Sequence, residues 1–178
     1  MEGLRGQLLV ARHQLDDPNF HRTVVLLLDH TDEGTFGVVL NRPLEVEVDD
    51  VLPGWGAAVS GPSTLFQGGP VGLDGAIGVA VGGGSLDLMA APFGLIDLDS
   101  DPEPLVGALT GLRVFAGHSG WGGGQLEAEI EEGSWFVVPA ETADAFTPEP
   151  DQLWRRVLRR QGGDLAIVAS YPEDASLN

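Results

Sequence analysis

The chain contains 178 residues, of which 43% are hydrophobic and 20% are charged, and its formal net charge is −18. A chain of this length buries roughly 70% of the surface of its unfolded form, so one core suffices and we expect a single domain over residues 1–178. The negative charge repels phosphate backbones and anionic lipids, which argues against direct binding of nucleic acid or of a membrane. Cysteine and lysine are absent, which excludes disulfides, thiolate nucleophiles and Schiff-base lysines.

The chain also lacks the sequence features of membrane insertion and secretion. The longest uninterrupted apolar runs, such as residues 24–28, are about a quarter of the roughly 20 residues that cross a bilayer. The start of the chain has neither a sustained apolar stretch nor a small-residue cleavage site. We therefore expect a cytoplasmic protein.

Short apolar runs between glycine, proline and aspartate residues predict a strand-rich protein. The predicted strands cover residues 8–11, 24–29, 36–40, 77–81, 112–116, 135–139 and 165–169. The stretch 53–72 is rich in glycine and proline but contains Trp55, Leu65 and Phe66, so we expect a structured loop there.

The clearest helical pattern runs from Thr147, a possible N-cap, to Gly162, which can end a helix. Pro148 suits the first turn, and apolar residues recur at helical spacing at positions 153, 154, 157 and 158. The arginines at positions 155, 156, 159 and 160 are expected to form a solvated or ion-paired face.

Other helical patterns are weaker. Residues 123–132 fit either a helix or a half-buried strand, because glutamates alternate with apolar residues. On a strand Glu127 and Glu129 would share a face, whereas on a helix they would diverge. Short helices are predicted near 48–52, 103–110 and 142–146, and helices mixed irregularly among strands favour an α+β fold.

Two arginines near predicted strand ends suggest an anion site. Arg22 and Arg42 could converge with the amides of Gly68 and Gly69 on a carboxylate or phosphate, through charge-assisted hydrogen bonds. The alternative is that both arginines pair with nearby acidic residues and hold the fold together. Asn41, Gly120 and Trp121 lie in neighbouring glycine-rich or turn-forming segments, so we include them as candidate binding residues.

An enzymatic interpretation depends on Ser119. The segment 116–130 reads as a glycine-rich turn between a strand and a helix, and Gly117-His118-Ser119-Gly120-Trp121 approaches the G-x-S-x-G nucleophile elbow. The motif has Trp121 in place of the second glycine, and His118 cannot easily face the hydroxyl of its neighbour. The four histidines form no metal-binding motif, so we predict no metal site and no cofactor.

Several blocks together resemble the YqgE/AlgH family of bacterial proteins. The resemblance covers nearly the whole chain, and the order of the blocks makes it specific. The blocks are GQLLVAR at 6–12, DPNF at 17–20, His30, Gly37, NRPL at 41–44, GGPV at 68–71, GWGGGQLEAEI at 120–130, SWFVVPA at 134–140 and LWRRVLRRQGGDLAIVA at 153–169. It implies an α+β fold with a bifurcated, largely antiparallel sheet curled into a pseudo-barrel with peripheral helices, and it implies no activity.

The family resemblance also carries a description as a transcriptional regulator. The sequence has no helix-turn-helix pattern, its net charge is −18, and its only basic cluster lies on one predicted helix. We therefore favour a regulatory or binding module that recognises a small anion or a protein partner, and that could form oligomers. The alternative is an enzyme of unknown reaction, such as a hydrolase that uses Ser119. Trp55 and Phe66 are our candidates for an exposed apolar patch that would contact a protein.

Overall fold

The structure is a computed structural model that describes residues 3–82 and 87–171. Its strands are β1 (Gln7–Ala11), β2 (Val24–Thr31), β3 (Gly34–Val39), β4 (Pro43–Glu47), β5 (Thr64–Gln67), β6 (Val71–Val81), β7 (Asp87–Ala90), β8 (Phe93–Ile96), β9 (Gly111–Gly122) and β10 (Trp135–Pro139). The α-helices are α1 (Val48–Val51), α2 (Gln125–Glu131), α3 (Leu153–Gln161) and α4 (Gly163–Val168). The 3-10 turns are η1 (Glu103–Leu105), η2 (Thr142–Phe146) and η3 (Pro150–Gln152).

The long strand β9 is the branch point of the sheet. Its first half pairs with β6 and its second half pairs with β3, while β5 pairs with its middle and carries β4 outward. The main path runs β10-β1-β2-β3-β9-β6-β8-β7, and every pair is antiparallel except β5 with β9. These features confirm the predicted α+β fold with a branched, largely antiparallel sheet. Within the described residues its two ends, β10 and β7, do not pair, so the sheet stays open.

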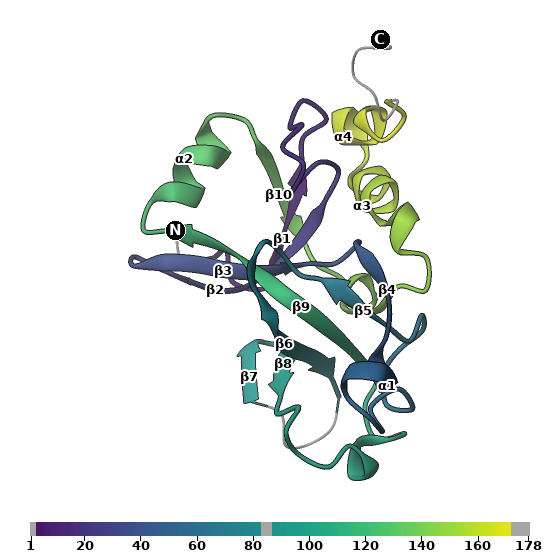
Figure 1. Ribbon diagram of the computed structural model, residues 1–178. Helices are drawn as coiled ribbons and strands as arrows, with labels where there is room; N and C mark the ends of the chain where they lie inside the picture. The colour runs from purple at the N-terminus through teal and green to yellow at the C-terminus, as the bar shows by residue number, and fades with distance from the viewer. Residues whose placement is uncertain (1–2, 83–86, 172–178) are drawn as a thin grey trace.

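The helices lie outside the sheet at separate places (Figure 1). Helix α2 covers one side of the β1–β2–β10 region, and α3 with α4 covers the other side. Strand β1 explains this arrangement, because Leu8 and Val10 face the α3 core while Leu9 and Ala11 face the α2 core. A strand with both faces buried reads as a continuous apolar run, as β1 and β2 do.

Glycines allow the strands to cross closely at the branch point. Gly69 has φ 153°, and a Cβ atom there would lie 2.2 Å from the carbonyl oxygen of His118. Gly117, with φ 74°, lies inside β9 where that strand changes partners. Strand β9 continues to Gly122, so the predicted glycine-rich turn between strand and helix is present but lies at residues 123–124, directly before α2.

Two other secondary-structure predictions need correction. The predicted strand at 165–169 is helix α4, because Gly162 and Gly163 adopt φ 72° and 56° and redirect the chain, after which Leu165, Val168 and Ala169 pack on the core at helical spacing. Helix α3 begins at Leu153 rather than at Pro148, since Thr147 accepts a hydrogen bond from the Glu149 amide and η3 intervenes.

The predicted apolar patch at Trp55 and Phe66 is also wrong. Their exposed fractions are 3% and 0%, and both side chains belong to core clusters. The stretch 53–72 is structured and contributes to the core, as predicted, but it contains β5 and the start of β6 and is therefore not a loop throughout. No helix in residues 3–82 or 87–171 is long and apolar enough to cross a membrane.

Candidate functional site

Three of the predicted binding residues line one cavity of about 270 Å³. Arg22 comes from the segment between β1 and β2, and Asn41 and Arg42 follow β3. Trp154 and Arg155 come from the start of α3, more than a hundred residues later in the chain. We call this cavity the arginine cavity; its remaining lining residues are His21 and Asp151.

Arg22 is held in an unusual backbone conformation. Its φ of 54° lies in the left-handed region, which a residue with a side chain adopts only when its surroundings impose it. Its guanidinium carbon lies 4.3 Å from the centre of the Trp154 ring, and its Nη2 donates to the carbonyl of Tyr171 at 2.6 Å. The fold therefore places this side chain between the β1–β2 segment and the C-terminal helices.

Asn41 fixes the backbone beneath the cavity rather than presenting free polar atoms. Its Oδ1 accepts from the Val24 amide at 3.0 Å, and its Nδ2 donates to the Arg22 carbonyl at 2.9 Å. These two bonds join the segment before β2 to the segment after β3. Asn41 thus positions Arg22 and Arg42 relative to each other.

The arginines of this cavity contact main-chain oxygens. Arg42 donates to the carbonyls of Pro18, at 2.8 Å, and His21, at 3.1 Å. Arg155 donates to the carbonyls of Ala169 and Tyr171. Within the described residues neither Arg42 nor Arg155 forms an ion pair, so the alternative of pairing with a nearby acidic residue is wrong for Arg42.

Burial makes the charge of Arg42 costly. It lowers the pKa of Arg42, and the carboxylate of Asp17 opposes this effect only partly. A guanidinium has an ordinary pKa above 12, so the side chain remains charged at neutral pH. The cavity therefore concentrates positive charge on a protein whose net charge is −18.

Gly68 and Gly69 do not form the predicted anion-binding concavity. Both are buried against β9, and the Gly68 amide donates to the Ala116 carbonyl at 2.9 Å. A Cβ atom at Gly68 would lie 2.4 Å from the Gly117 carbonyl oxygen. These glycines serve the crossing of the strands, and the predicted convergence of their amides with Arg22 and Arg42 is wrong.

Ser119 is equally occupied by the fold. It lies inside β9 opposite Gly37, is fully buried, and donates its hydroxyl to the Gly68 carbonyl at 3.0 Å. A nucleophile elbow requires a sharp turn between strand and helix that exposes the hydroxyl. Ser119 satisfies neither requirement, so the geometry does not support a hydrolase that uses it.

Gly120 and Trp121 lie on β9 near α2, where they form a different cluster. Trp121 is 6% exposed, and its indole Nε1 donates to Glu129 at 3.0 Å; the indole of Trp135 donates to the same oxygen at 3.0 Å. Gly120 pairs with Phe36. Glu129 therefore acts as a half-buried link between two strands and α2, and these residues do not line the arginine cavity.

Glu127 points to a separate partner, as expected for a helix. Its Oε2 lies 3.5 Å from Nε2 of His30, whose Nδ1 contacts the hydroxyl of Thr35 at 2.6 Å. In the described part of the chain no group of three or more histidine, aspartate or glutamate side chains could hold a metal ion.

Comparison with known proteins identifies the relatives of this chain. The family model described as AlgH-like matches residues 8–166. The chain belongs to the AlgH-like family. It is 54% identical to a UPF0301 protein of Streptomyces avermitilis, with coverage of 100% of this chain and 97% of that protein, and 51% identical to one of Thermobifida fusca, with coverage of 98% and 96%.

Solved structures show the same AlgH-like fold. A crystal structure of a Corynebacterium diphtheriae protein matches with a TM-score of 0.89 at 35% identity, covering 96% of this chain and 94% of that one. The solution structure of the AlgH protein from Pseudomonas aeruginosa matches with a TM-score of 0.71 at 28% identity, covering 95% and 94%. The resemblance read from the sequence motifs is thereby confirmed.

The sequence thus predicted Arg22, Asn41 and Arg42 of the arginine cavity but not the residues that α3 contributes. Arg155 and Trp154 were assigned to a helix with an arginine face, and nothing in their spacing shows that α3 packs beside the β1–β2 segment. The cavity presents guanidinium donors, an indole face and one imidazole. This set can bind an anion with bidentate hydrogen bonds, but it offers no activated nucleophile.

Proposed function

We propose that this AlgH-like protein is a binding module whose arginine cavity takes a small carboxylate or phosphate anion. The observation that carries the proposal is the convergence of Arg22, Arg42 and Arg155 from three distant segments on one cavity. Asp151 is the single acidic residue among those that line it.

The chemistry of the partners supports this function. Carbonyl oxygens satisfy guanidinium N–H groups without cancelling their charge, so an anion gains both hydrogen bonds and Coulomb attraction. The planar ring of Trp154 under Arg22 holds that guanidinium in place, which lowers the ordering cost of binding. A cavity of this kind suits one small anion better than an extended nucleic acid, which a net charge of −18 repels.

A thermal-shift scan tests the proposal with sulfate, orthophosphate and citrate at matched ionic strength. An anion at about 100 times its dissociation constant adds roughly 2.7 kcal/mol of stability, which raises the midpoint of a chain this size by about 5–10 °C. We expect at least one of these anions to produce such a shift.

Matched variants locate the effect. Arg42→Gln and Arg155→Gln should each abolish the anion-dependent shift, measured against the variant's own midpoint without anion. Arg159→Gln removes the same charge from an exposed position of α3 outside the cavity, so it should keep the shift. A flat scan, or equal loss in Arg159→Gln, contradicts the proposal and favours a protein partner.

A further inference from the structure

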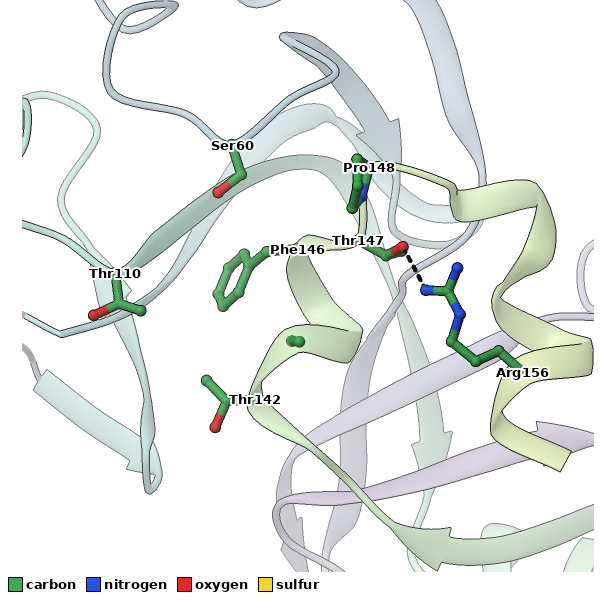
Figure 2. Close-up of a pocket in the computed structure, with 8 residues that line it drawn as sticks. Ser60, Thr110, Thr142, Phe146, Thr147, Pro148 and Arg156 are labelled. Atoms are coloured by element: carbon green, nitrogen blue, oxygen red, sulfur yellow. Dashed lines mark hydrogen bonds between the residues drawn. The ribbon is translucent and has the colours of Figure 1, made fainter. Parts of the chain in front are cut away.

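A second cavity, of about 390 Å³, lies on the far side of α3 from the arginine cavity, between η2, the start of β9 and the segment at residue 60. Figure 2 shows the ring of Phe146 among the side chains of Ser60, Thr110 and Thr142, with Arg156 beyond Thr147. We call it the Phe146 pocket. Its volume lies within the range of small-molecule sites, roughly 300–1,000 Å³.

The pocket wall is fixed in place by ion pairs and close packing. Asp144 of η2 is 4% exposed and accepts two hydrogen bonds from Arg160, at 2.9 and 2.8 Å. Arg160 also lies 3.0 Å from Glu141, which forms a capping box with Asp144. Under the Phe146 ring, a Cβ atom at Gly111 would lie 2.5 Å from the ring, so only glycine admits this packing. A preformed wall reduces the ordering cost of a ligand.

A buried positive charge stands directly behind this wall. Arg113 is 1% exposed and donates to four carbonyls, those of Ser60, Gly61, Ala145 and Thr147. Within the described residues it forms no ion pair. Burial lowers the pKa of Arg113 to about 10, which leaves the guanidinium charged at neutral pH.

The position of Arg113 extends its field into the pocket. Ser60 and Thr147 line the pocket through their side chains while their carbonyls hold Arg113. An unpaired charge in a low-dielectric interior acts more strongly on its neighbours than one in water. An anionic group in the pocket would therefore be attracted from behind the wall.

The open groups in the pocket specify the rest of a ligand. The hydroxyls of Thr110 and Thr142 form no hydrogen bond within the part of the chain that the structure describes, so both can bind a polar atom. Phe146 and Pro148 offer an apolar surface. Arg156 is partly engaged, since it donates to the Thr147 hydroxyl at 3.0 Å and to Glu149 at 3.3 Å, but its side chain is 43% exposed and retains free N–H groups.

From this arrangement we infer that the Phe146 pocket binds a small amphipathic monocarboxylate. Its apolar body packs on Phe146 and Pro148, and its carboxylate faces Arg156 in the field of Arg113. A phosphate dianion would need more charged donors than Arg156 alone supplies on the pocket surface. This site shares no lining residue with the arginine cavity, so it is independent of the proposed function.

The test is a titration of ¹⁵N-labelled protein with sodium benzoate, with benzamide as an uncharged molecule of the same shape. Benzoate should cause saturable shifts at the amides of Thr110, Thr142 and Phe146, and benzamide should bind about tenfold more weakly, because it lacks the charge that strengthens the hydrogen bonds. The indole signal of Trp154 reports on the arginine cavity in the same spectra.

Three variants test whether benzoate binds in the Phe146 pocket. Arg156→Gln should weaken benzoate binding about three- to tenfold, whereas Arg159→Gln, an exposed charge outside the pocket, should not. Thr142→Ile fills the pocket and should abolish the shifts, while sulfate should still move the Trp154 indole in that variant. The inference is overturned by benzoate that leaves the pocket amides unchanged, by benzamide that binds equally well, or by equal effects of Arg156→Gln and Arg159→Gln.

Discussion

The two sides of α3 use arginine in opposite ways. On one side Arg160 contacts Asp144 and Glu141, and the hydrogen bonds that Arg160 donates to Asp144 raise the pKa of Arg160 despite its partial burial. On the other side Arg155 donates to carbonyls and, among the described residues, forms no ion pair, and the neighbouring Arg42 has its pKa lowered by burial. Both environments occur within two turns of one helix.

The difference shows how a structural arginine is distinguished from a binding one. A buried carboxylate partner such as Asp144 neutralises the guanidinium, so the pair contributes to folding and leaves little charge for a ligand, whereas water screens an exposed pair such as Arg156 with Glu149. Carbonyl partners fix the geometry and leave the charge in place. The spacing of the four arginines in the sequence does not show which of them pair with a carboxylate and which contact carbonyls, because this depends on the segments that pack against each side chain.

The largest expected loss of stability follows from removing the carboxylate of Asp144, which pairs with Arg160 on one side of α3. Asp144→Ala leaves Arg160 without its main partner and breaks the capping box of η2. We expect a loss of about 3 kcal/mol of stability. This corresponds to a midpoint lowered by about 6–12 °C in a thermal melt.

The control is Asp164→Ala, which removes an exposed carboxylate from the first turn of α4. Its cost should stay within about 0.5 kcal/mol. Similar losses in the two variants would mean that Asp144 contributes no more than a surface charge, and the contrast between the sides of α3 would fail.

A smaller loss of stability is expected when Arg160 or Arg155 is replaced, and the two losses can be compared directly. Arg160→Gln should cost about 2 kcal/mol, because buried Asp144 loses its counter-charge. Arg155→Gln should cost about 1 kcal/mol, since the carbonyls it leaves can be hydrated at a partly exposed site. Urea denaturation measures both, and an equal or reversed order contradicts the assignment of Arg155 to binding.

The sequence predicted the framework of the fold well where apolar runs were continuous. Strands β1 and β2 follow from such runs, since burial of both faces leaves an unmistakable pattern. Strand β10 was also predicted from its apolar run, although Val137 is exposed. Strands β4, β5, β7 and β8 were missed because they are short, and β4 is also mostly exposed. Helix α4 was mistaken for a strand, because six apolar-rich residues carry too little periodicity to separate the two.

The candidate site was predictable only in part, for a geometric reason. Arg22, Asn41 and Arg42 lie close together because β2 and β3 are adjacent strands, so their proximity could be inferred from strand order. Arg155 and the Phe146 pocket depend on long-range packing of α3 and η2, which local patterns do not encode. The glycines at 68 and 69 were misread, since close strand crossing and anion binding both require a missing side chain.

The smallest expected effect is a change in the pKa of His13. This pKa reports on the charge of the arginine cavity, because Arg22 influences it. Burial lowers the pKa of His13, and the positive charges of Arg12 and Arg22 lower it further. Because the folded protein then binds this proton more weakly than the unfolded chain does, stability falls as the pH drops below about 6.5.

Sulfate keeps its double negative charge between pH 5 and 8, so it can test this coupling without titrating itself. If it occupies the arginine cavity, it offsets the charge of Arg22 and raises the pKa of His13 back toward its usual value. An NMR titration of the His13 ring with and without sulfate measures the change, and Arg155→Gln should eliminate it. A midpoint that sulfate does not raise would place the anion away from Arg22. The arginine cavity would then be a structural feature like the Arg160 network, and the contrast between the two sides of α3 would disappear.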